Sequence, residues 1–211
     1  MSIDSYHHRL KPGTAGGTIV FAFHGTGGDE NQFFDFAARL FPEATIVAPR
    51  GDVSEMGALR FFRRTGEGVY DMDDLARRTE IMSRFVEAHA EKAEAGLVVG
   101  LGYSNGANIL ASMMIEDGGL FDGAFLMHPL IPWSPKPSPA LEAREIVITA
   151  GERDPICPKP ETIRLADYFK GEGASVKTVW HPGGHEIQQS EIEAARQFAE
   201  GFQATTGRSA G

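Results

Sequence analysis

Short apolar segments alternate with amphipathic segments along the chain, and this alternation constrains the fold more than any other feature. Nearly continuous apolar runs, typical of strands covered on both faces, occupy residues 18–23, 45–48, 97–102, 123–127, 145–149 and 175–180. Apolar residues recur near the helical period of 3.6 residues in segments 31–40, 74–95, 107–115 and 191–202. The series predicts an α/β fold in which a mostly parallel central sheet carries helices on both faces.

The length of the chain predicts a single domain. Its 211 residues, of which 42% are hydrophobic, suffice for one core. We find neither an internal repeat nor a linker of the length that separates domains, so we predict one domain over residues 1–211. Residues from about 204 to 211 are polar and small, and we expect them to form a flexible tail.

Charge and composition exclude several classes of partner. The net charge of −9 argues against nucleic acid and against an anionic membrane, because both attract basic surfaces. No segment approaches the ~20 apolar residues of a membrane span, and the start lacks a signal-peptide pattern, so we expect a soluble, cytoplasmic protein. The single cysteine, Cys157, and the scattered histidines do not form a zinc-binding pattern. We therefore expect no metal and no cofactor.

A serine flanked by glycines lies between the third predicted strand and the next helical segment. The sequence Gly102-Tyr103-Ser104-Asn105-Gly106 has the pattern G-x-S-x-G, which in a strand, turn and helix context exposes a nucleophilic serine above a sheet. A side chain at either glycine would collide with the neighbouring strand or helix. This context favours a nucleophile over a tight turn that contains a serine by chance, so Ser104 is the candidate nucleophile.

A serine nucleophile needs a base and an acid that orients the base. Asp154 follows the predicted strand 145–149 in a loop stiffened by prolines. His185 follows the last predicted strand, in a segment where two glycines let the chain fold back over the sheet. Both residues therefore follow Ser104 in the chain order of serine, aspartate and histidine that this pattern requires.

Three other residues compete for these two roles. Asp122 precedes a strand and would lie at the wrong edge of the sheet, because ligands of parallel sheets bind at the carboxyl ends of the strands. His181 ends a strand before a proline, which suits a packing role. His128 ends the preceding strand and fits a residue that lines the site without acting as the base.

The glycine-rich segment HGTGGDE, residues 24–30, directly follows the first predicted strand. Its three glycines let the backbone turn sharply and approach another molecule closely. It lacks the glycine patterns of phosphate-binding loops. Acyl transfer places negative charge on a carbonyl oxygen, and this charge needs fixed backbone N–H donors. We predict the N–H groups of Thr26 and Asn105 as these donors.

Five segments in order resemble the small phospholipase/carboxylesterase family of α/β-hydrolases, whose relatives include dienelactone hydrolases and acyl-protein thioesterases. The segments are HGTGGDENQF, RGDVSEMGALRFFRR, GYSNGANI, GERDPICP and PGGHEI, and the resemblance runs from about Tyr6 to Phe202. It is strongest to a bacterial subgroup of carboxylesterases associated with hydroquinone stress. The resemblance implies an α/β-hydrolase fold and a serine hydrolase that acts on short esters.

The resemblance also implies a role for each candidate. It makes Ser104 the nucleophile, His185 the general base and then acid, and Asp154 the orienting carboxylate, with Thr26 and Asn105 as the oxyanion hole. Dienelactone hydrolases carry cysteine at the nucleophile position and dehalogenases carry aspartate, whereas this chain has serine. Many thioesterases of the family have HGLGD where this chain has Thr26 and a second glycine, so a preference for long acyl chains is not carried over.

Two connections are predicted to frame the cleft without a large cap domain. The segment between 123–127 and 145–149 has no amphipathic stretch long enough for a helical cap. Its Leu130, Ile131 and Trp133 are candidates for an apolar wall, although a surface loop that packs the tryptophan inward fits this sequence equally well.

The second connection spans residues 59–75. Its aromatic residues Phe61, Phe62 and Tyr70 are candidates for an acyl or aromatic pocket, and its arginines Arg60, Arg63 and Arg64 for binding a substrate carboxylate. The alternative is that these arginines pair on the surface with Asp71, Asp73 and Asp74. From the whole chain we predict five substrate-binding residues: His24, Phe62, Arg63, Tyr103 and Ile131.

These observations predict a carboxylesterase that cleaves small carboxylic esters through an acyl-serine intermediate. A thioesterase with the same three residues and a non-catalytic small-molecule binding protein are the alternatives. His185 must be neutral to accept the serine proton, so kcat/KM should rise with pH through the value of ~6.5 that is usual for histidine. The family resemblance is compatible with a homodimer.

Overall fold

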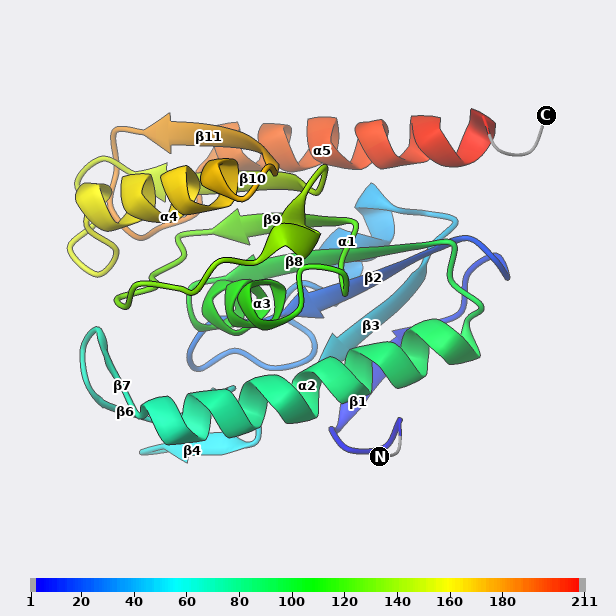
Figure 1. The fold of residues 1–211 in the computed structure, drawn as a ribbon. Helices are drawn as coiled ribbons and strands as arrows, with labels where there is room; N and C mark the ends of the chain where they lie inside the picture. Colours follow the sequence, from blue (N-terminus) through cyan, green and yellow to red (C-terminus); the bar gives the residue numbers. More distant parts are fainter. Residues whose placement is uncertain (1–2, 209–211) are drawn as a thin grey trace.

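A seven-stranded sheet forms the centre of the computed structural model, which describes residues 3–208, with side chains up to residue 203 (Figure 1). Its strands are β1 (His8–Lys11), β2 (Thr18–Phe23), β3 (Thr45–Pro49), β8 (Leu97–Tyr103), β9 (Gly123–Met127), β10 (Glu145–Gly151) and β11 (Ser175–His181). They lie in the order β1-β3-β2-β8-β9-β10-β11. All neighbours are parallel except β1, which pairs antiparallel with β3 at one edge. The carboxyl ends of the parallel strands therefore meet along one edge of the sheet.

Helices cover both faces of this sheet (Figure 1). Those in the described residues are α1 (Phe34–Leu40), α2 (Met72–Lys92), α3 (Asn105–Glu116), α4 (Lys159–Gly171) and α5 (Gln189–Arg208). Helices α2, α3 and α4 pack on one face, and α1 and α5 pack on the other. Successive strand residues point to opposite faces. In β2, Phe21 belongs to the core under α2, α3 and α4, and Val20 belongs to the core under α1 and α5. This arrangement explains why the strands are continuous apolar runs.

The predicted fold class is confirmed by this topology. The strands predicted at 18–23 and 123–127 have those bounds, and the other four extend one or two residues further. Sequence analysis missed β1, a four-residue edge strand with mostly polar residues. It also missed α4, whose buried apolar residues are few and whose start contains a proline. Both elements have weak hydrophobic patterns because each buries little surface.

The long connections contain only small elements. Residues 53–70 form two hairpins, β4 (Val53–Glu55) with β5 (Ala58–Arg60) and β6 (Arg64–Gly66) with β7 (Val69–Tyr70). Residues 128–144 contain one turn of 3-10 helix, η1 (Pro139–Leu141). In the part of the chain that the structure describes, these connections build no helical cap domain.

The last helix is longer than predicted. Helix α5 runs from Gln189 to Arg208, so the backbone of residues 204–208, predicted as part of a flexible tail, is helical. The rest of that predicted tail, residues 209–211, lies outside the described residues. No helix in the described range is both long and apolar enough to cross a membrane.

Candidate active site

Ser104 lies at the turn between β8 and α3, at the carboxyl edge of the sheet. Its backbone has φ 52° and ψ −116°, a conformation that costs energy for any residue with a Cβ. A Cβ on Gly102 would lie 2.6 Å from the carbonyl oxygen of Gly106, and a Cβ on Gly106 would lie 2.4 Å from that of Phe23. Glycine is therefore required at both positions for β8, α3 and β2 to approach this closely, as the sequence predicted.

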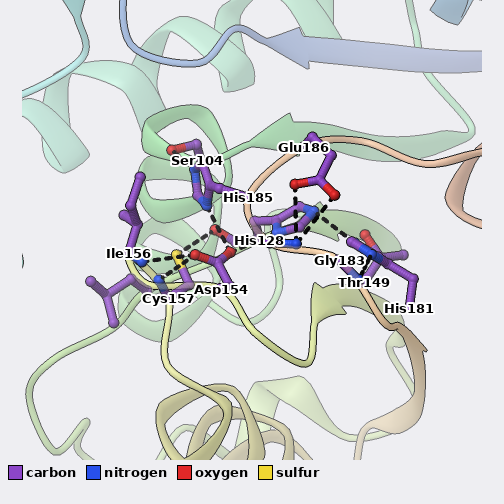
Figure 2. Close-up of polar contacts among 12 residues, drawn as sticks. Ser104, His128, Thr149, Asp154, Ile156, Cys157, His181, Gly183, His185 and Glu186 are labelled. Carbon is purple, nitrogen blue, oxygen red and sulfur yellow. Dashed lines mark hydrogen bonds and ion pairs between the residues drawn. The ribbon is translucent and has the colours of Figure 1, made fainter.

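The structure brings the three predicted catalytic residues together. The Oγ atom of Ser104 lies 2.9 Å from Nε2 of His185, and Nδ1 of His185 lies 2.7 Å from Oδ2 of Asp154 (Figure 2). The loop that carries His185 passes directly over the end of β10, because a Cβ on Gly151 would lie 2.0 Å from the oxygen of Gly184. The Tyr103 hydroxyl donates a hydrogen bond of 2.8 Å to the His185 carbonyl and fixes the loop from the other side.

Asp154 is buried and accepts four hydrogen bonds. Its Oδ1 accepts from the backbone N–H groups of Ile156 and Cys157, at 2.8 and 2.9 Å. Its Oδ2 accepts from His185 and also from Nδ1 of His128, at 2.8 Å. Burial by itself raises the pKa of this carboxyl, but the hydrogen bonds from the two histidines and the backbone outweigh burial and hold the pKa well below its usual range. Asp154 is therefore ionised at neutral pH.

Thr26 and Asn105 both border the cleft next to Ser104. Asn105 is the first residue of α3, and the N–H groups of a first helical turn have no acceptor within their own helix. The Thr26 loop approaches this turn closely, because a Cβ on Gly25 would lie 2.7 Å from the ring of Tyr103. The loop is held by a hydrogen bond of 2.8 Å from Arg60 Nη1 to Thr26 Oγ1. Two backbone segments from distant parts of the chain therefore meet beside the serine.

A cleft of about 280 Å³ opens above Ser104 and His185. One of its walls is polar and consists of Arg60, Arg64 and Glu67 from the hairpin segment. The Arg60 side chain is only 3% exposed and lies 3.3 Å from Glu55, which also binds Arg64 at 3.1 Å. Burial, with the nearby charge of Arg64, lowers the pKa of Arg60. The cleft can therefore take a small molecule and presents guanidinium groups to it.

Four of the five predicted substrate-binding residues lie away from this cleft. Phe62 is fully buried in the core with α2 and α3, and Ile131 is buried beside a separate cavity next to α4. His24 is buried and links two loops, donating to the Gly25 carbonyl at 2.7 Å and accepting from the Gly51 N–H at 2.8 Å. Arg63 points outward with 57% of its side chain exposed. Only Tyr103 borders the cleft as predicted.

The arginines of segment 59–75 separate into two groups. Arg63 pairs with Asp71 at 2.9 Å, as the surface alternative predicted, because β6 and β7 turn its side chain outward. Arg60 and Arg64 instead pair with Glu55 and border the cleft. Their direction is decided by the register of two short hairpins, which the sequence pattern does not reveal.

Sequence analysis missed Asn108, which also borders the cleft. Its Nδ2 donates to the Tyr70 hydroxyl at 2.8 Å, and its Oδ1 accepts from the Leu130 N–H at 2.7 Å. Asn108 lies in the first turn of α3, four residues after Ser104, and its N–H donates to the Ser104 carbonyl at 2.9 Å. That spacing was the available signal for this residue.

Of the competing residues, Asp122 lies at the opposite edge of the sheet, where it accepts from the Val98 N–H at 2.8 Å. His128 forms a hydrogen bond with Asp154, and both His128 and His181 lie close to Glu191 of α5. Within the described residues, two groups have ligand atoms close enough to share one metal ion: His128 with His181 and Glu191, and His128 with Asp154 and His185. In both groups these atoms already contact one another, through hydrogen bonds to Asp154 and ion pairs with Glu191.

Comparison with known proteins shows which family and which solved structures this chain resembles. Residues 62–201 match the model of the dienelactone hydrolase family. The chain is 37% identical over 193 residues to a Bacillus subtilis (strain 168) protein named "Putative hydrolase MhqD", covering 90% of this chain and 96% of that protein. The fold matches a protein of unknown function, Atu2452 from Agrobacterium tumefaciens str. C58, with a TM-score of 0.91, 58% identity and coverage of 96% and 99% of the two chains. It also matches a Bacillus cereus carboxylesterase with a TM-score of 0.86, 32% identity and coverage of 94% and 95%.

Proposed function

Since this chain belongs to the dienelactone hydrolase family, we propose that it is a serine carboxylesterase that cleaves small carboxylic esters through an acyl-serine intermediate. The matches make the chain a hydrolase similar to carboxylesterases. The observation that carries the finer proposal is the continuous contact from Ser104 Oγ through His185 to Asp154, at 2.9 and 2.7 Å. A serine with this contact can lose its proton to the imidazole as it attacks a carbonyl carbon.

In the proposed reaction, His185 Nε2 takes the proton of Ser104 while Oγ forms a bond to the ester carbonyl carbon. The carbonyl oxygen becomes negative and accepts hydrogen bonds from the N–H groups of Thr26 and Asn105. His185 then gives the proton to the leaving alcohol as the ester bond breaks. Water, activated by the same imidazole, releases the acid and restores the serine. Asp154, ionised throughout, holds His185 in the required orientation.

The size and lining of the cleft support small substrates. A volume of about 280 Å³ lies at the lower end of ligand sites. The cleft is lined both by the charged Arg60, Arg64 and Glu67 and by Tyr70, Leu130 and Ile156. A short acyl group is therefore the expected substrate. Cytoplasmic location and a homodimer stay predictions of the sequence.

The test is intact-protein mass spectrometry after reaction with a fluorophosphonate, together with turnover of p-nitrophenyl esters of increasing acyl length. Wild type should gain one adduct and hydrolyse the shortest esters fastest. Ser104→Ala should do neither. Ser112→Ala is the matched control, because Ser112 also lies on α3 but is buried against Thr79 at 2.9 Å.

Absence of an adduct on folded wild type would contradict the proposal and favour a binding protein on a hydrolase scaffold. Faster turnover of thioesters than of matched oxygen esters would favour a thioesterase instead.

A further inference from the structure

His128 lies next to Asp154 and His185 (Figure 2). Its ring contacts a second carboxylate, that of Glu191. Its Nδ1 lies 2.8 Å from Oδ2 of Asp154, and its Nε2 lies 3.1 Å from Oε1 of Glu191. The hydrogen bond to Asp154 requires an N–H at Nδ1, because a carboxylate oxygen only accepts. Nε2 also lies 3.5 Å from Nε2 of His181, and its contact with Glu191 is an ion pair when Nε2 is protonated as well. The ring is therefore placed where protonation sets a buried positive charge between two buried carboxylates.

Glu191 is fixed as an acceptor by its other partners. It lies in the first turn of α5, where its Oε2 accepts from the Gln188 N–H at 2.7 Å and lies 3.2 Å from His181 Nε2. Its Oε1 accepts from the hydroxyl of Thr149 on β10. The Glu191 side chain is fully buried. Glu191 thus connects the start of α5 to β10 through two hydrogen bonds, and its oxygens also contact His128 and His181.

The backbone of His128 is held in an uncommon conformation. Its φ is 51°, in the left-handed region that residues other than glycine seldom adopt and that costs energy. The residue directly follows β9, and its N–H donates to the Thr149 carbonyl at 2.8 Å. Strain that the surrounding contacts maintain is concentrated at functional sites. This position therefore favours a role for the His128 side chain beyond packing.

The titratable groups around His128 come from four parts of the chain. They are Tyr103 on β8, Asp154 and Cys157 after β10, His181 and His185 at and after the end of β11, and Glu191 on α5. Burial by itself lowers the pKa of His128, but hydrogen bonds to Asp154 and Glu191 outweigh burial and raise it to about 9. The pKa of Glu191 is lowered, because its hydrogen bonds to His128 and Thr149 outweigh the effect of burial. These directions agree with a positively charged His128 between two negatively charged carboxylates.

His128 and His185 share one oxygen of Asp154 (Figure 2). Their ring centroids are 5.0 Å apart. A cation at His128 therefore repels a second positive charge on His185 and takes part of the acceptor strength of Asp154. Such a cation therefore disfavours a positive charge on His185, which acts as a base only in its neutral form.

We propose that His128, as an imidazolium held between Asp154 and Glu191, is a positioning residue that acts through Asp154 on His185 and extends esterase activity to lower pH. The inference rests on the proposed function, because it needs His185 to act as the base. It assigns a catalytic effect to a buried charge pair that makes no contact with the substrate.

The test compares pH profiles of kcat/KM for p-nitrophenyl acetate between wild type and His128→Asn. Asparagine tolerates the left-handed backbone and carries no charge. We expect the acid limb of the profile to move up by about one pH unit, so that kcat/KM falls ~10-fold at the acid end and less at pH 8.5. His89→Asn is the matched control, because His89 is also a buried histidine but lies on α2 against the Ile3 carbonyl. Its profile should coincide with that of wild type.

His128→Asn leaves the buried Glu191 carboxylate without a cation and can therefore destabilise the fold. A second variant avoids this effect. The double variant His128→Asn with Glu191→Gln removes both charges, and its acid limb should move in the same direction. If the profiles of the folded variants coincide with wild type after correction for active protein, the inference is wrong while the esterase proposal stands. If wild type itself forms no acyl-enzyme, both proposals fall.

Nitrogen-15 NMR of the histidine rings gives a readout that does not depend on activity. We expect both nitrogens of His128 to be protonated from pH 5.5 to 7.5 in wild type, and the ring to lose a proton at lower pH in Glu191→Gln. A neutral His128 at pH 7 would overturn the inference. So would one equivalent of zinc in the purified protein that is lost in His128→Asn.

Discussion

The two sides of the cleft are built in opposite ways. We call Ser104, Asp154, His185 and their partners His128 and Glu191 the catalytic wall. Its first four residues lie on turns that leave β8, β9, β10 and β11, and Glu191 lies in the first turn of α5. Asp154, His128 and Glu191 have fully buried side chains. We call residues 53–70 the hairpin wall. Its two hairpins form separate two-stranded sheets outside the main sheet, and the side chains of its charged residues Glu55 and Glu67 are 32% and 57% exposed.

From this difference we infer that the catalytic wall carries out the reaction, whereas the hairpin wall selects the substrate. Parallel strands fix the catalytic wall on both sides, so its atoms keep the distances that proton transfer needs. Phe61 and Phe62 anchor the hairpin wall in the core. The rest of this wall is held by ion pairs and short turns, where substitutions have small effects on the rest of the fold. We therefore expect changes in the catalytic wall to abolish function or stability, and changes in the hairpin wall to alter the choice of substrate.

The largest effect is expected from Gly106→Ala. The new Cβ would lie 2.4 Å from the Phe23 oxygen and 2.5 Å from the His24 oxygen, so β2 or α3 must move. We expect a loss of more than about 3 kcal/mol in the free energy of unfolding, and at least a 100-fold fall in the rate of fluorophosphonate labelling. Urea unfolding and mass spectrometry measure the two quantities.

Gly171→Ala is the control for this substitution. Gly171 is the last residue of α4, and a Cβ there has open space. Alanine should leave labelling unchanged and stabilise the protein slightly. Equal behaviour of the two variants would mean that the turn at Ser104 is not held rigidly, and the contrast between the walls would lose its basis.

A smaller effect is expected from the buried charge of His128. Its pKa is raised to about 9 in the folded protein, against ~6.5 for an unfolded chain. Its stabilising contribution is therefore complete below pH ~6.5 and disappears as the pH rises through 9, a change of about 3 kcal/mol. Urea unfolding of wild type and His128→Asn should show a stability difference that shrinks by this amount between pH 6 and pH 10. A difference that stays constant would show that His128 is neutral in the folded protein.

The contrast between the catalytic wall and the hairpin wall also explains which features of the molecule could be predicted from its sequence. The continuous apolar strands and the glycines around Ser104 leave strong local patterns, so the fold class and the positions of six main strands along the chain were predicted correctly. Asp154 and His185 follow strand ends, where the geometry of a parallel sheet gathers side chains at one edge. The structure places both within hydrogen-bond distance of their expected partners.

Other parts of the site depend on contacts that no local pattern encodes. Phe62 and Ile131 are apolar residues in loops, and only the packing of those loops decides that they join the core rather than the cleft. The His128 and Glu191 pair joins β9 to α5 across 63 residues of chain. Glu191 reads in the sequence as an ordinary acidic residue in the first turn of a helix, and its burial comes entirely from the tertiary structure.

The smallest effect is expected from Arg63→Gln in the hairpin wall, and the matched variant is Arg64→Gln. Arg63 is 57% exposed and pairs with Asp71 outside the cleft, so the unfolding midpoint and the turnover of all esters should match wild type within error. Arg64 is 22% exposed and borders the cleft, and removal of its charge should lower kcat/KM for a p-nitrophenyl ester with a free carboxylate several-fold relative to the neutral ester. The ratio of the two rates cancels differences in active protein between the variants. If Arg63→Gln changes this ratio as much as Arg64→Gln does, the hairpin wall acts through its overall charge rather than through the residues that border the cleft.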